Sequence, residues 1–328
     1  MGPHFSFFRH LKKFIFTLIF GILIAILAPL PIHGSSPSEG ETIKRMIRVG
    51  ELDRVYYLHV SANLPENKPL PLVLMFHGGG GTPAYAERES KFSELADHEG
   101  FLVAYPEGIG KSWNDGRGIQ DIPAQGKNID DLGFISALID DVSKDYPVNR
   151  KMVFATGMSN GAIFTHYLAM NLSNRIAAIA PVAGGIGKAV ANSFNPAQPV
   201  SVLIIQATTD PLVPYNGGDV TIFGLKKHAG IISTDDTIQK WGKFDHCNPQ
   251  AVIEDLPNRD PDDSCVEKRF TFANGSNGTE VILIQIIGGG HTWPDGIQYL
   301  SKILVGPVCH DFNASQSIWQ FFKAHPKP

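Results

Sequence analysis

The sequence predicts an α/β fold in which a mostly parallel central sheet carries helices on both faces. Three observations support this prediction. The chain has 328 residues and is 43% hydrophobic, which is enough apolar material for a large buried core. Short continuous apolar runs, typical of strands buried on both faces of a sheet, alternate with amphipathic helical segments. No internal repeat and no Pro/Ser-rich linker separates these segments, so we expect one domain.

Residues 1–34 have the pattern of a secretory signal peptide. Three basic residues and no acidic one precede an apolar run from Phe14 to Leu30, and small polar residues follow it. An uncleaved membrane anchor is the alternative, because the run approaches the shortest length that spans a bilayer. We expect cleavage, with residues 35–328 forming the exported domain.

The remaining segments follow from their local patterns. Thr42–Val60 contains two alternating runs and predicts an antiparallel hairpin. From Pro71 onward the apolar runs are continuous, which predicts parallel strands with right-handed crossovers. The predicted strands are Pro71–Phe76, Phe101–Tyr105, Lys151–Thr156, Ile176–Val182, Val200–Gln206, Lys268–Phe272 and Val281–Ile287. The predicted helices are Ala84–His98, Asp131–Asp145, Asn160–Leu172, Thr234–Phe244 and Ala314–Ala324.

Charge and cysteine content exclude several classes of protein. The formal net charge is −4 and no basic stripe is present, so a nucleic-acid binder is not expected. No C-x-x-C or H-E-x-x-H spacing occurs, and we expect neither a metal nor an organic cofactor. Export would permit a disulfide. We expect Cys247 and Cys265 to pair across a Pro- and Asp-rich segment and to leave Cys309 free, with three unpaired thiols as the alternative.

The sequence Gly157-Met158-Ser159-Asn160-Gly161 has the form G-x-S-x-G, and it stands between a predicted strand and a predicted helix. On such a sharp turn the glycines avoid side-chain clashes, and the serine oxygen projects at the helix N-terminus. There the backbone N–H of Asn160 can help to bind an oxyanion. A glycine-rich turn with a capping serine is the alternative.

A nucleophilic serine needs a base that is oriented by an acid. In this architecture the acid and then the histidine follow the serine along the chain, on loops after later strands. Asp210 follows the strand at Val200–Gln206, and His291 follows the strand at Val281–Ile287 on a glycine-rich loop. We expect this pair to act with Ser159. The rival acids are Asp219 and Asp235, and the rival bases are His166 and His310.

The run His77 to Gly81 (HGGGG) ends the first core strand. Its glycines let backbone N–H groups approach a ligand closely. We expect Gly79 and Gly80 to supply the second oxyanion donor, and His77 to be structural. A phosphate-binding loop is the alternative, but the Lys-Ser/Thr pair that such a loop needs is missing.

Several motifs in order resemble the esterase/polyhydroxybutyrate depolymerase family, which is related to secreted feruloyl and acetylxylan esterases. They are FHGGGG, YPEGIGKSWNDGRG, DDLGFISALID, GMSNGA, TTDPLVPYNGG and GGGHTWP, within about residues 70–325. The resemblance implies an α/β-hydrolase fold, a triad of Ser159, Asp210 and His291, and an oxyanion loop at Gly78–Gly81. It implies a secreted serine esterase with no cofactor and no obligate protein partner.

The substrate is less closely defined by the sequence. A small ester, a hydroxyalkanoate oligomer or a hydroxycinnamoyl ester would fit, and a feruloyl or acetylxylan esterase is the alternative function. A surface-binding protein without activity on the same fold is a further alternative. No appended polymer-binding module is expected. Trp113, Tyr215 and Trp293 lie in loops that carry the motifs, so we expect them to line the acyl pocket, although they could instead wedge these loops onto the core.

Overall fold

A computed structural model describes residues 40–222 and 225–328. The predicted signal peptide, residues 1–34, lies outside the described residues. In the part that is described, no helix is both long and apolar enough to cross a membrane.

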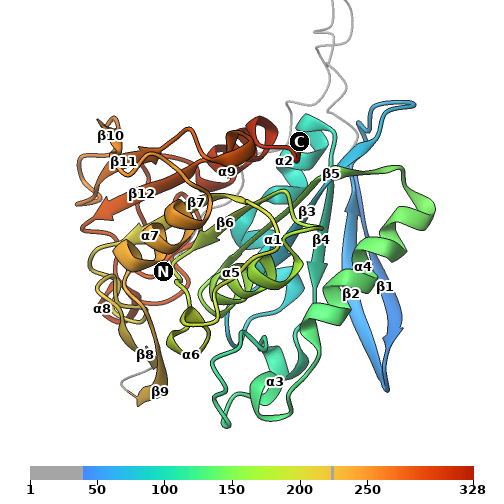
Figure 1. The fold of residues 1–328 in the computed structure, drawn as a ribbon, viewed down its shortest axis with the longest axis horizontal. Helices are drawn as coiled ribbons and strands as arrows, with labels where there is room; N and C mark the ends of the chain where they lie inside the picture. The colour runs from blue at the N-terminus through green and yellow to red at the C-terminus, as the bar shows by residue number, and fades with distance from the viewer. Residues whose placement is uncertain (1–39, 223–224) are drawn as a thin grey trace, which may run out of the picture. The chain divides into compact units, whose positions relative to one another are not determined.

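The centre of the structure is a ten-stranded sheet with the order β1-β2-β4-β3-β5-β6-β7-β12-β11-β10 (Figure 1). The six strands from β4 to β12 in this order are mutually parallel. Antiparallel strands extend the sheet at both edges. The predicted mostly parallel sheet is thereby confirmed. The strands are β1 (Glu41–Val49), β2 (Leu52–Val60), β3 (Leu70–Phe76), β4 (Leu102–Pro106), β5 (Val148–Met158), β6 (Ala178–Val182), β7 (Ser201–Ala207), β10 (Val252–Asp255), β11 (Val266–Phe272) and β12 (Val281–Ile287).

Helices cover both faces of the sheet because successive side chains of a strand point to opposite faces. Leu72 and Leu74 of β3 pack into the core that contains side chains of α4, α5 and α7. Val73 and Met75 pack into the second core, with side chains of α1, α2 and α9. The helices are α1 (Pro83–Ser90), α2 (Phe92–Glu99), α4 (Asp131–Asp145), α5 (Asn160–Leu172), α7 (Thr234–Phe244) and α9 (Ala314–Ala324), with the short α3 (Pro123–Gly126), α6 (Lys188–Ala191) and α8 (Lys302–Val305).

Besides the short strand β10 and the short helices α3, α6 and α8, which were not predicted, two local features differ from the sequence prediction. The predicted helix Ala84–His98 is two helices, because Lys91 adopts a left-handed conformation (φ 53°) that ends α1 and precedes α2. A two-stranded antiparallel sheet of β8 (Gly218–Ile222) and β9 (Leu225–Ile231) was not expected. Its strands contain Gly, Asp and Lys, so they lack the apolar runs that marked the central strands.

The predicted disulfide is wrong. Cys265 pairs with Cys309, and Cys247 is a free, buried thiol. The sheet explains the difference, since Cys247 packs in the core on one face while Cys265 and Cys309 pack in the core on the other. A bridge between Cys247 and Cys265 would have to pass through the sheet.

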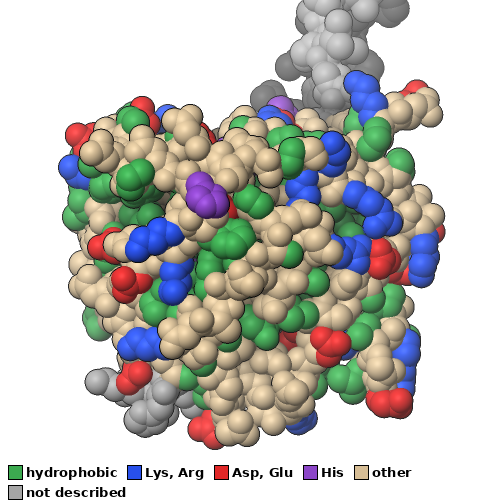
Figure 2. Space-filling model, viewed as in Figure 1, with side chains coloured by type: hydrophobic (Ala, Val, Ile, Leu, Met, Phe, Trp, Pro, Cys, Tyr) green, Lys and Arg blue, Asp and Glu red, His purple; other side chains and the backbone are tan. Residues whose placement is uncertain are grey.

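Charged side chains of both signs are mixed on the face shown in Figure 2. Arg45 of β1 pairs with Asp141 and Asp145 of α4. Arg175, which follows α5 in the chain, pairs with Asp140 of α4. Each of these basic side chains is therefore paired with a neighbouring acid.

Candidate active site

Ser159 lies on a sharp turn between β5 and α5. Its backbone has φ 58° and ψ −120°, a conformation that few residues other than glycine adopt. The turn is possible because Gly157 and Gly161 pack against β3. A Cβ at these positions would lie 2.7 and 2.4 Å from the carbonyl oxygen of Phe76. The two glycines thus allow the turn that presents the serine hydroxyl in front of the sheet.

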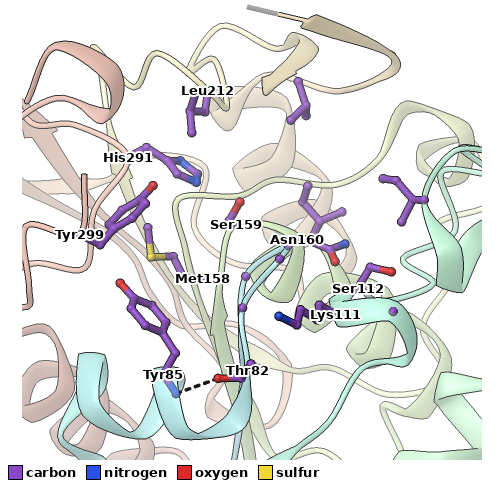
Figure 3. A pocket seen from close by; sticks show the side chains of 18 of the residues that line it. Thr82, Tyr85, Lys111, Ser112, Met158, Ser159, Asn160, Leu212, His291 and Tyr299 are labelled. Carbon is purple, nitrogen blue, oxygen red and sulfur yellow. Dashed lines mark hydrogen bonds between the residues drawn. The ribbon is translucent and has the colours of Figure 1, made fainter. Parts of the chain in front are cut away.

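Asp210 and His291 meet beside this turn, although 81 positions separate them in the sequence. Nδ1 of His291 and Oδ2 of Asp210 are 2.7 Å apart, and both side chains are buried. An ionised carboxylate only accepts hydrogen bonds, so Nδ1 carries the proton and Nε2 is free to accept one. Figure 3 shows the imidazole and the Ser159 hydroxyl facing the same space. A serine, a histidine and an aspartate placed in this way could act as nucleophile, base and orienting acid.

The backbone holds both members of this pair in place. Oδ1 of Asp210 accepts hydrogen bonds from the N–H groups of Leu212 and Val213, at 2.8 and 2.9 Å. The N–H of His291 donates to the carbonyl of Val305 at 2.5 Å. The loop before His291 comes so close to this segment that a Cβ at Gly290 would lie 2.2 Å from the same carbonyl oxygen.

The rival residues lie in other environments. His166 is buried, accepts a hydrogen bond from Nε1 of Trp241 at 3.1 Å, and has its pKa lowered by burial to about 3. His310 is exposed beside Asp295. Asp235 is exposed and accepts from Tyr215, and Asp219 has no contact with His291 among the described residues.

The glycine-rich loop after β3 lies against the Ser159 turn. A Cβ at Gly78 would be 3.5 Å from that of Ser159, and one at Gly79 would be 3.6 Å from that of Asn160. Gly80 cannot be the predicted oxyanion donor, because its N–H already donates to the carbonyl of Lys111 at 2.8 Å. The N–H of Gly79 has no acceptor among the described residues. The N–H of Asn160, at the first position of α5, has no partner within the helix.

His77 holds the glycine-rich loop rather than facing the serine. Its Nδ1 donates to the carbonyl of Gly78 at 2.8 Å, and its Nε2 accepts from the N–H of Gly108 at 3.1 Å. Burial lowers the pKa of His77, which favours this neutral form. The expectation of a structural role agrees with these contacts.

A buried polar network supports the same loop from behind. The Asn160 side chain accepts from the N–H of Trp113 at 2.8 Å and donates to Asp115 at 2.7 Å. Oδ2 of Asp115 also accepts hydrogen bonds from two nitrogen atoms of Arg117, at 2.7 and 3.0 Å. Nε1 of Trp113 donates to the carbonyl of His77 at 2.8 Å. Sequence reasoning did not assign roles to Asp115 and Arg117, although both lie in the quoted motif YPEGIGKSWNDGRG.

A cavity of about 640 Å³ opens in front of the serine. Ser159, His291 and the glycine-rich loop line its base (Figure 3). Tyr85, Glu89 and Tyr299 line one wall, and this wall was not predicted. The other residues that line the cavity include Lys111, Ser112, Arg117, Ile122, Ile163, Leu212 and Val220.

The three aromatic residues predicted for the pocket do not line this cavity. Trp113 is fully buried and stacks on Phe164, with ring centroids 5.2 Å apart. Trp293 is buried and donates from Nε1 to Ser315 at 3.2 Å. The Tyr215 hydroxyl is hydrogen-bonded to Gln285 and Asp235. The alternative that these residues wedge loops onto the core fits the two tryptophans.

Comparison with known proteins relates the chain to esterases. No protein-family profile matches it. NocK of Nocardia uniformis subsp. tsuyamanensis, which is named as an esterase, is 29% identical over 307 residues, covering 91% of this chain and 87% of that protein. Feruloyl esterase B of Piromyces equi is 27% identical over 236 residues, covering 70% of this chain and 41% of that protein. The chain thus spans less than half the length of the second relative.

Solved structures show the same fold. The acetyl xylan esterase of Aspergillus awamori superposes with a TM-score of 0.52 and 16% identity, over 76% of this chain and 94% of that one. Together with the parallel sheet and the helices on both faces, this similarity identifies the α/β-hydrolase fold that the motifs implied.

Proposed function

We propose that this chain is an esterase related to the feruloyl and acetylxylan esterases, and that it uses a Ser159–Asp210–His291 triad. The observation that carries the proposal is the 2.7 Å contact between His291 and Asp210, on the same cavity as Ser159. The serine stands on a strained turn at a helix N-terminus, where a nucleophile of this fold is expected.

The reaction has two halves. Ser159 Oγ attacks the ester carbonyl carbon while Nε2 of His291 takes the hydroxyl proton, and His291 then gives that proton to the departing alcohol. Water next attacks the acyl-enzyme, His291 takes a proton from it, and the acid leaves as the Ser159 hydroxyl is restored. Asp210 stabilises the imidazolium in both halves. The N–H groups of Asn160 and Gly79 bind the oxyanion.

The finer substrate assignment is also a proposal. The motif resemblance favours a polyhydroxybutyrate depolymerase-like esterase acting on small esters or hydroxyalkanoate oligomers. The named relatives favour feruloyl or acetylated plant cell-wall esters as the second candidate. We further propose that residues 1–34 direct secretion and that residues 35–328 form the catalytic domain.

The test is a panel of p-nitrophenyl esters, methyl ferulate and a hydroxybutyrate trimer, ranked by kcat/KM for the native protein and for Ser159→Ala. Loss of a triad nucleophile costs on the order of 10⁶ in kcat, so the variant should lose turnover of every ester. Ser193→Ala, at an exposed position, serves as the matched control and should retain native rates. Substantial activity in Ser159→Ala would refute the assignment of the nucleophile.

A further inference from the structure

Glu89 is a buried carboxylic acid in the wall of the active-site cavity. It lies near the end of α1, lines the cavity and is only 3% exposed. Tyr85, one turn earlier on the same helix, donates its hydroxyl to Oε1 of Glu89 at 3.1 Å. No other described residue makes a hydrogen bond to this carboxyl group. The proposed triad does not use Glu89, so the presence of an acid in this wall requires another explanation.

Tyr299 supplies a second polar group to the same wall. It lies eight residues after His291 in the sequence, and its ring packs edge-on against Tyr85 with centroids 6.4 Å apart. Among the described residues, nothing is hydrogen-bonded to its hydroxyl. In Figure 3 the two phenols and His291 lie on the same side of Ser159. A hydrogen-bonding acid and an uncommitted hydroxyl therefore face the cavity close to the reacting atoms.

We propose that Glu89, Tyr85 and Tyr299 form a subsite that binds a hydroxyl group of the ester substrate. This inference rests on the proposed function, because it takes Ser159 and His291 as the reacting centre. A hydroxyl can both donate to and accept from this wall, and it would satisfy the carboxyl group that is otherwise buried with one partner.

Other ligand groups fit the wall less well. A substrate carboxylate would be repelled by Glu89 in its ionised form, and an ammonium group would be repelled by His291 when the imidazole becomes protonated during turnover. A purely apolar group would leave the acid desolvated without compensation. Burial raises the pKa of Glu89 to about 7, so near neutral pH the carboxyl group is available both as donor and as acceptor. The favoured substrates are neutral esters that carry a free hydroxyl.

The hydroxyl could belong to either half of the ester, and two matched pairs separate these cases. p-Nitrophenyl butyrate and p-nitrophenyl 3-hydroxybutyrate differ by a hydroxyl in the acyl group. Ethyl butyrate and 2-hydroxyethyl butyrate differ by a hydroxyl in the alcohol. The quantity measured is the ratio of kcat/KM within each pair, for the native protein and for Glu89→Leu, Glu89→Gln, Tyr299→Phe and the exposed control Glu94→Leu.

A hydrogen bond to a group that is partly ionised corresponds to a factor of about ten in affinity. The native protein should therefore prefer the hydroxylated ester by about tenfold in one of the pairs. Glu89→Leu should bring that ratio close to one, Tyr299→Phe should lower it, Glu89→Gln should retain part of it, and Glu94→Leu should leave it unchanged. If circular dichroism shows that Glu89→Leu is unfolded, the kcat/KM ratio for Tyr299→Phe decides whether the subsite exists.

Two results would overturn the subsite. One is a native ratio near one in both pairs, and the other is a native ratio that survives in folded Glu89→Leu or, if that variant is unfolded, in Tyr299→Phe. In both cases the esters are still hydrolysed, so the proposed function stands. Failure of the native protein to hydrolyse any of the four esters would instead refute the proposed function, and the subsite with it.

Discussion

Two sides of the active-site cavity are built differently. On the side of the proposed oxyanion donors, which we call the oxyanion side, the side chains of His77 and Trp113 donate hydrogen bonds to carbonyls of the glycine-rich loop, and the N–H of Gly80 donates to the carbonyl of Lys111. Behind it, the Asn160 side chain and Asp115 are linked by further buried hydrogen bonds. On the opposite side, which we call the tyrosine wall (Tyr85, Glu89 and Tyr299), one hydrogen bond joins two of the three side chains.

This difference in hydrogen bonding suits two tasks, stabilisation of the transition state and selection of the substrate. Donors that stabilise a transition state act best when they are already in position, because no reorganisation is then needed during the reaction. The oxyanion side meets that condition. Groups that select a substrate must instead keep hydrogen-bonding capacity for it, as the tyrosine wall does. Changes on the oxyanion side should therefore alter rate for all esters, and changes on the tyrosine wall should alter the choice among them.

Asp210 does not line the cavity and belongs to neither side, and its replacement should have the largest effect in this series. In Asp210→Asn the amide would no longer hold His291 as the tautomer with a proton on Nδ1, and loss of this control lowers kcat by about 10⁴ in serine hydrolases. The reduction should be equal for hydroxylated and plain esters. Steady-state kinetics with both matched pairs would check this, and a loss confined to one member of a pair would contradict it.

Asp115→Ala should affect rate and stability together. It would leave Arg117 buried without its partner, which costs about 3–5 kcal/mol in unfolding free energy, and it would remove the nearer of the two acceptors of the Asn160 amide nitrogen. Because Asn160 is a proposed oxyanion donor, we expect kcat to fall about tenfold for every ester with little change in KM. Urea unfolding and kinetics measure the two effects. Asp53→Ala, at an exposed position, is the control.

Two results would contradict the predicted effect of Asp115→Ala on kcat. If Asp115→Ala lowered stability but left kcat unchanged, the network would be only structural. If instead the ratio within a matched pair changed, the two sides of the cavity would not be separable as described.

The disulfide supports the loop that carries His291. Sγ of Cys309 lies 3.0 Å from the place where a Cβ at Gly289 would stand, two residues before the histidine. Cys265→Ser combined with Cys309→Ser should lower the unfolding free energy by about 2–4 kcal/mol, with kcat at room temperature nearly unchanged. Cys247→Ser should have a much smaller effect. Peptide mapping without reduction would test the pairing, and a Cys247–Cys265 peptide would contradict it.

The smallest expected effect is a pH dependence of stability from Glu267, remote from both sides of the cavity. Glu267 is 2% exposed, and neither of its oxygens accepts a hydrogen bond from a residue that the structure describes. Burial, and next the neighbouring Asp311, raise its pKa from 4.5 to about 8. The native state therefore holds this proton more tightly than the unfolded state does, so the stabilisation is complete below pH 4.5 and is lost as pH rises towards 8.

Replacement of this group should flatten that dependence. Glu267→Gln should melt at a temperature a few degrees above the native protein at pH 8, with a smaller difference at pH 5. Glu89 and Asp245 have pKa values raised to about 7 by burial, so part of the slope should remain. Melting curves of both proteins at half-unit pH steps measure this pH dependence. An unchanged difference between the two proteins at all pH values would contradict the assignment.

The sequence could predict what depends on local pattern. The central strands were visible because burial on both faces requires continuous apolar runs. The turn at Ser159 was visible because its two glycines flank the serine directly. Asp210 and His291 could be chosen because strand ends on one edge of a parallel sheet lie close together, and the structure brings them within hydrogen-bond distance.

What the sequence could not predict depends on which face of the sheet a residue reaches. Cys247 and Cys265 are the nearer pair in sequence, but they pack on opposite faces. Trp113 stands in a motif loop, yet its ring turns into the core. Glu89 gave no signal, because an acid in an amphipathic helix normally indicates a solvent-exposed position.

The measurement that tests the account most directly is covalent labelling with a fluorophosphonate, followed by peptide mass spectrometry. The probe phosphorus bonds to an activated serine oxygen and fluoride leaves. We predict one adduct per chain, on Ser159, abolished in Ser159→Ala and strongly slowed in Asp210→Asn. The Glu89→Leu protein should be labelled at a rate close to that of the native protein, because the probe carries no hydroxyl. An adduct on another serine, or ester hydrolysis without labelling of Ser159, would contradict the account.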